Sequence, residues 1–77
     1  MTIDGTLGVG TLGIRVNGEH RRVLGPASVA DMLREIGLDP GRVAVERNLA
    51  VIPRSLFPET AVEDGDEYEI VHIVGGG

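Results

Sequence analysis

The fold is decided first by residues 14–24, which spell IRVNGEHRRVL. Apolar and polar residues alternate in Ile14-Arg15-Val16, and Asn17-Gly18 is the dipeptide most typical of a two-residue hairpin turn. The residues from His20 to Leu24 are suited to the returning strand. We therefore predict that the fold begins with a β-hairpin.

The next stretch, residues 28–38 (SVADMLREIGL), predicts a short amphipathic helix. Ser28, with Asp31 three residues later, is typical of a helix N-cap with an acidic partner. Gly37 is a left-handed stop, and Leu38 supplies the apolar contact that often follows such a stop. Between these ends, one helical face is apolar and consists of Val29, Met32, Leu33 and Ile36.

Three further strands are predicted after the helix. Residues 42–46 (RVAVE) and 49–52 form two of them, and Pro53 restricts the second to a sheet edge. The longest strand is residues 67–74 (EYEIVHIV). Alternation places one set of its side chains on a single face: Tyr68, Ile70, His72 and Val74.

A single helix after a hairpin must cross one face of the sheet, because only there is its apolar stripe buried. We therefore predict an α+β protein, a ubiquitin-like β-grasp roll. Its mixed sheet has four to five strands, with the last strand near the centre and one main helix packed across it. Leu56 and Phe57 are expected to close one end of the core. Residues 1–12 are expected to form a glycine-rich N-terminal extension, residues 13–74 the β-grasp domain, and residues 75–77 a flexible C-terminal tail.

Composition excludes several classes of function. The chain of 77 residues has a net charge of −5, which disfavours nucleic-acid binding, and it has no cysteine for a disulfide or a thiol nucleophile. The glycines of residues 8–13 match G-x-G-x-x-G, but a strand-like segment follows them where a nucleotide site needs a helix. His20 and His72 lack companion ligands, so we expect no metal site. With no apolar run of about 20 residues and no signal peptide, we expect a cytoplasmic protein that binds no membrane.

The most informative chemistry lies after the last strand, where Gly75, Gly76 and Gly77 end the sequence. Glycines without side chains are suited to a narrow channel in a partner enzyme, and we expect Val74 to enter with them. An α-carboxylate with a pKa of about 3.5 is ionised at pH 7 and must be activated before it reacts. Adenylation of Gly77 with ATP, followed by replacement of AMP by sulfur, would give a thiocarboxylate. The catalytic groups, the ATP and the Mg²⁺ would come from the partner.

Four elements together resemble the ThiS sulfur carriers of thiamine biosynthesis over residues 14–77. They are VAVERN (residues 43–48), VIPR (residues 51–54), Asp64-Gly65-Asp66 and the terminal Gly76-Gly77. The resemblance implies a bacterial protein that is not an enzyme and binds no cofactor of its own. It implies adenylation of Gly77 by a ThiF-type adenylyltransferase and sulfur that originates from a cysteine desulfurase. A ThiG-type thiazole synthase would then receive the sulfur from the thiocarboxylate.

An acidic run beside the last strand should steer the chain to a basic partner face. The candidate docking residues are Arg54, Asp66, Glu67 and Glu69, and the chain alone is expected to be monomeric. Three alternatives remain: a MoaD-type carrier for molybdopterin or another sulfur-transfer pathway, an interaction module with an inert tail, and a ubiquitin-like tag transferred through Gly77.

Overall fold

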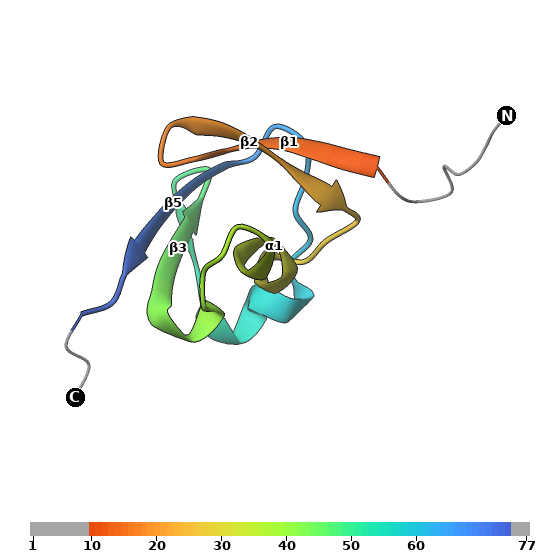
Figure 1. Cartoon of the computed structure of the whole chain (residues 1–77). Helices are drawn as coiled ribbons and strands as arrows, with labels where there is room; N and C mark the ends of the chain where they lie inside the picture. The colour runs from red at the N-terminus through yellow and green to blue at the C-terminus, as the bar shows by residue number, and fades with distance from the viewer. Residues whose placement is uncertain (1–9, 75–77) are drawn as a thin grey trace, which may run out of the picture.

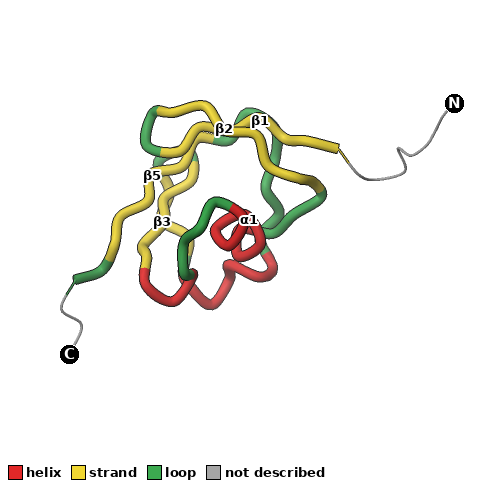
Figure 2. Tube along the Cα trace, in the orientation of Figure 1, coloured by secondary structure: helices red, strands yellow, loops and turns green. Residues whose placement is uncertain are grey.

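The computed structural model describes residues 10–74, and within them a five-stranded mixed sheet curves around one α-helix (Figures 1 and 2). The strand order is β2-β1-β5-β3-β4, with β5 parallel to β1 and antiparallel to β3. This is the predicted β-grasp roll with the last strand at its centre. The elements are β1 (Gly10–Val16), β2 (Glu19–Gly25), α1 (Val29–Glu35), the 3₁₀ turn η1 (Pro40–Arg42), β3 (Val43–Arg47), β4 (Ala50–Ile52), the 3₁₀ turn η2 (Arg54–Glu59) and β5 (Glu67–His72).

The predicted hairpin is confirmed, but its first strand is longer than expected. Asn17 (φ 52°) and Gly18 (φ 87°) both adopt the left-handed backbone of a type I′ turn. β1 begins at Gly10, so the boundary predicted after residue 12 is wrong by three residues. The half-buried Leu12 packs against the core, and its side chain occupies the space that a Cβ on Gly25 would need.

Helix α1 begins and ends through the local signals predicted for it. The hydroxyl of Ser28 accepts from the Asp31 N–H at 3.0 Å, and the Asp31 carboxylate accepts from the Ser28 N–H at 3.1 Å. At the other end Gly37 (φ 90°) and Leu38 donate to the carbonyls of Arg34 and Leu33, which is a Schellman motif. An N-cap such as Ser28 contributes about 1 kcal/mol. Such caps fix the limits of a helix too short to be stable in isolation.

One apolar core fills the space between the helix and the inner sheet face. Phe57 is buried there as predicted, whereas Leu56 is 44% exposed and does not close the core. β4 is an edge strand, as Pro53 predicted. The fully buried side chains with the largest volumes are Tyr68, Phe57, Ile14, Met32, Leu33, Val23, Val29, Val43 and Val45.

β5 ends two residues earlier than predicted. Tyr68 and Ile70 point into the core, but His72 and Val74 are exposed, because the strand has passed the helix by that point. The inner-face pattern predicted for residues 67–74 therefore holds only for its first half. In Figure 1 the end of β5 projects from the body of the fold, on the side opposite to the start of β1.

Candidate functional site

The predicted reacting residue, Gly77, and its neighbours Gly75 and Gly76 lie outside the described residues. Val74 is the last described residue, and 88% of its surface is exposed. The structure thus places the base of the predicted tail at the open end of the central strand.

β5 is held on both sides by backbone hydrogen bonds. On one side, Arg15 donates to the carbonyl of Asp66 at 3.0 Å and Asn17 donates to that of Tyr68 at 2.9 Å. On the other side β3 pairs with it from Tyr68 to His72, and Ile73 donates to the carbonyl of Arg42 at 2.9 Å. Because both neighbours hold β5, the strand is a fixed base for the residues that follow.

Two turn asparagines extend this hold on β5 beyond the strands themselves. The Asn17 amide donates to the carbonyl of Ile70 at 3.0 Å and accepts from its N–H at 2.8 Å, as a further β1 residue would do. Asn48 (φ 50°) accepts from the N–H of Glu67 at 3.0 Å through its side chain. The two hairpin turns therefore clamp the strand that leads to the predicted tail.

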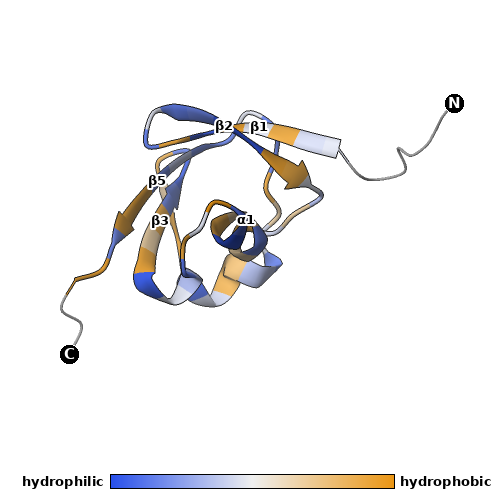
Figure 3. Ribbon diagram, in the orientation of Figure 1, coloured by the Kyte–Doolittle hydropathy of each residue, from blue (hydrophilic) through white to orange (hydrophobic). Residues whose placement is uncertain are grey.

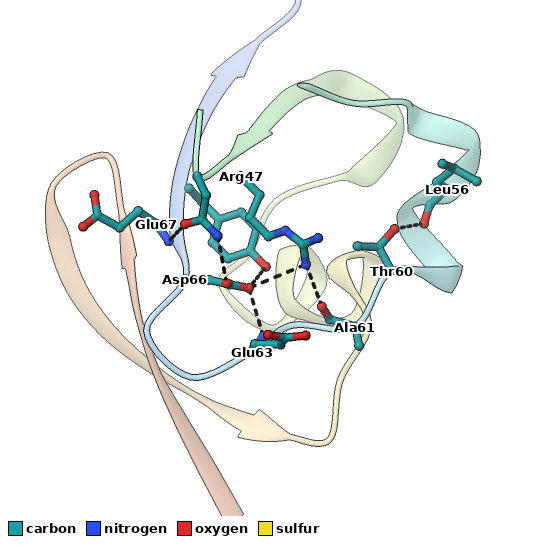
Figure 4. Close-up of polar contacts among 9 residues, drawn as sticks. Arg47, Leu56, Thr60, Ala61, Glu63, Asp66 and Glu67 are labelled. Atoms are coloured by element: carbon teal, nitrogen blue, oxygen red, sulfur yellow. Dashed lines mark hydrogen bonds and ion pairs between the residues drawn. The ribbon is translucent and has the colours of Figure 1, made fainter. Parts of the chain in front are cut away.

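A buried polar cluster anchors the start of β5 (Figure 4). The Asp66 carboxylate, 5% exposed, accepts from the Tyr68 hydroxyl at 2.8 Å and from the N–H of Glu63 at 2.9 Å. The Asn48 side chain donates to it at 3.3 Å, and Arg47 lies 3.8 Å from it. Burial and the Asp66 carboxylate raise the pKa of Tyr68 well above its ordinary value of 10.0. The cluster ties the β3–β4 hairpin to β5.

The four predicted docking residues do not form one group. Glu67 and Glu69 are exposed on β5, whereas Arg54 is exposed on η2. Asp66 is buried, and its oxygens are occupied by donors of its own chain. The prediction of Asp66 as a docking residue is therefore corrected, because a carboxylate held in this way stabilises the fold. Nothing in the sequence indicates that Asp66 is buried while the acidic residues beside it are exposed.

Sequence reasoning missed an apolar cluster on the outer sheet face, opposite the helix. Val71 and Ile73 are 60% and 48% exposed, and Ala44 lies directly across from Val71 in the β3–β5 register. Figure 3 shows the apolar colour on the last part of β5 and, after a short hydrophilic break, on the segment that follows it. A signal was present, because the end of EYEIVHIV is apolar at odd as well as even positions. We call Ala44, Val71 and Ile73 the outer patch.

The described residues contain few groups suited to chemistry of their own. In residues 10–74 no three His, Asp or Glu side chains gather as metal ligands. Over the same residues no helix has the length and apolar character to cross a membrane.

An open depression of about 370 Å³ is bordered by Arg15, Glu67 and Glu69. The glycines from Gly10 to Gly13 lie in β1, so that part of the glycine pattern is strand. What the arrangement supplies is a rigid base and exposed surface around the end of β5.

Solved structures of similar fold come from the same family that the sequence resembles. The crystal structure of a thiamine biosynthesis protein, ThiS, from Geobacter metallireducens superposes with a TM-score of 0.71 at 33% identity. The match covers 86% of this chain and 100% of the Geobacter chain.

Curated relatives fall into two lengths. The sulfur carrier protein ThiS of Bacillus subtilis is 40% identical over 50 residues, which is 65% of this chain and 76% of that protein. A thiazole synthase of Paramagnetospirillum magneticum is 47% identical over 62 residues, 80% of this chain. The chain spans only about a fifth of the length of this synthase and of a second one from Magnetococcus marinus. The sequence model of the ThiS family matches residues 14–77, so this chain belongs to the ThiS family.

Proposed function

We propose that the chain is a sulfur carrier of thiamine biosynthesis and that Gly77 carries the sulfur. The observation that supports this most directly is the family match, which extends from residue 14 to residue 77. The structure adds a physical reason, because β5 is held by both neighbours and by Asn17, and only Ile73 and Val74 separate it from residues 75–77. A reacting group on such a base can be offered to a partner while the fold stays closed.

The proposed chemistry takes place at the carboxyl group of Gly77. A carboxylate oxygen attacks the α-phosphorus of ATP, pyrophosphate leaves, and an acyl-adenylate forms. A sulfur nucleophile at the oxidation level of sulfide then attacks the carbonyl carbon, and the bond to AMP breaks. The product is a thiocarboxylate, whose sulfur is a soft nucleophile. The adenylating enzyme supplies the Mg²⁺ and the groups that stabilise both displacements.

Three partners follow from this proposal. A ThiF-type adenylyltransferase activates Gly77, and a cysteine desulfurase is the origin of the sulfur. A thiol reductant brings this sulfur from the persulfide to the sulfide level and is itself oxidised to a disulfide, and a thiazole synthase receives the sulfur from the carrier. The synthase is supported by the two relatives of that name, since each contains a segment like this chain. We propose that these steps occur in the cytoplasm, that the carrier alone is monomeric, and that it is a co-substrate rather than a catalyst. The named relatives favour this pathway over a molybdopterin-type carrier.

The intact mass of the chain tests the proposal after incubation with ATP, the activating enzyme and a sulfur source. Exchange of one carboxyl oxygen for sulfur is expected, and deletion of Gly77 should abolish it without changing the circular dichroism spectrum. Sulfuration of the truncated chain would refute the proposal. Adducts on lysines of other proteins would instead support tagging, and an unchanged mass would support an inert tail.

A further inference from the structure

The edge of β5 that faces β1 loses its partner just before the predicted tail. β1 pairs with β5 only at Glu67 and Tyr68, and the Asn17 side chain continues the pairing as far as Ile70. Beyond Ile70, on this side, residues 10–74 provide no further hydrogen-bonding neighbour for the strand.

The register shows which backbone groups this leaves open. Ile73 donates to the carbonyl of Arg42, and the pairing of Val43 with His72 follows next in the ladder. In an antiparallel ladder hydrogen-bonded and non-hydrogen-bonded pairs alternate, so the N–H and C=O of His72 point away from β3. His72 is exposed, and within the described residues no hydrogen bond satisfies its backbone. The central strand therefore becomes an edge strand at this residue.

Reach restricts where a partner must sit, if Gly77 reacts as proposed above. Gly77 lies only three positions after Val74, and a fully extended chain covers about 10 Å over that distance. An active site that contacts the Gly77 carboxyl group must therefore lie against the end of β5. The exposed edge lies at this position.

We propose that the enzyme that activates Gly77 lays an extended segment of its own chain along the edge of β5 at His72 and Val74, adding a strand to the sheet. Backbone hydrogen bonds supply affinity in such strand addition, and alternate side chains supply specificity. Val71 and Ile73 are exposed on one face of this segment, and Val74 is exposed beyond it. The incoming segment should therefore carry apolar side chains. This inference rests on the proposed function.

His72→Pro is the most direct test, because proline lacks the N–H that points to the open edge. The substitution removes no hydrogen bond to β3. The matched control is His72→Ala, which removes the same side chain but keeps the N–H. We expect kcat/KM for pyrophosphate release at the activating enzyme to fall about tenfold for His72→Pro relative to His72→Ala. Equal values for the two folded variants would overturn the inference.

A second pair keeps the test decisive if His72→Pro does not fold. Val74 lies beyond the last hydrogen bond to β3, so Val74→Pro leaves the ladder intact, and Val74→Ala is its control. The same tenfold difference is expected, and its absence contradicts strand addition. Amide hydrogen exchange gives a direct reading, since the N–H of His72 should exchange more slowly in the complex than in the free chain. If the unmodified chain is not activated at all, the proposed function itself fails.

Discussion

Replacing Asp66 by alanine should destabilise this protein more than any change to its exposed carboxylates. The substitution removes the acceptor for the buried Tyr68 hydroxyl and for the N–H of Glu63. Each buried donor left without a partner costs about 1–3 kcal/mol, and the substitution leaves two of them. Arg47 adds little, because its side chain is 30% exposed and 3.8 Å away. We expect a loss of about 2–6 kcal/mol.

That loss is large against the total, because a domain of this length has an unfolding free energy of about 4–12 kcal/mol. Urea unfolding followed by far-ultraviolet circular dichroism measures it. Glu69→Ala is the matched control, since Glu69 is an exposed carboxylate on β5, three positions after Asp66. Its change should stay within about 0.5 kcal/mol.

A double-mutant cycle with Tyr68→Phe identifies the interaction responsible. In the natural chain, loss of the hydroxyl should cost about 1–2 kcal/mol. In the Asp66→Ala background it should cost nothing or restore stability, because the hydroxyl there has lost its acceptor. The coupling energy should then be about 1–3 kcal/mol. An equal cost of Tyr68→Phe in both backgrounds, or a change below about 0.5 kcal/mol for Asp66→Ala, would refute this account of the cluster.

Three further predictions concern the same strand. Tyr68 is the only tyrosine, and its pKa is raised in the folded state, so its contribution to stability is complete below pH 10 and is lost as the pH rises further. Ultraviolet titration should show no phenolate at pH 10 until the chain unfolds, and ionisation with the ordinary pKa would contradict this. Glycine at position 17 can adopt the left-handed turn, but Asn17→Gly loses both hydrogen bonds to Ile70. The substitution should lower the free energy of unfolding by about 1–3 kcal/mol and speed hydrogen exchange of the Ile70 amide. An exchange rate equal to that of the wild type would contradict the role of Asn17 in holding β5. Val71→Asp should lower kcat/KM for activation of Gly77 about tenfold or more. Leu24→Asp, at an equally exposed residue of β2, should leave it unchanged. Identical values for the two variants would exclude the outer patch from docking.

Features set by neighbours in sequence were the ones that could be predicted. The Asn17-Gly18 turn, the Ser28 cap and the Gly37 stop each depend on residues no more than five positions apart. The central position of the last strand also followed, because one helix after a hairpin leaves few ways to bury its stripe.

What could not be predicted depends on contacts between distant residues. Gly10 joins β1 because it pairs with Gly25, and this pairing overrides the weak strand preference of a glycine-rich segment. Asp66 differs from Glu67 through its burial beside Tyr68: Asp66 is 5% exposed, whereas Glu67 is an exposed residue of β5. The outer patch went unrecognised because Ala44 and Val71 become neighbours only through the β3–β5 register.

The parallel pairing of β1 with β5 also determines how the molecule responds to force. Pulling Gly10 and Val74 apart draws the two strands along each other, so the bonds from Arg15 to Asp66 and from Asn17 to Tyr68 are loaded in shear. Bonds loaded in this way must break together, whereas a hairpin pulled from its ends opens one pair at a time. A partner that pulls on the end of β5 therefore meets high mechanical resistance. Single-molecule stretching between residues 10 and 74 should show one abrupt rupture, and gradual extension would contradict shear loading.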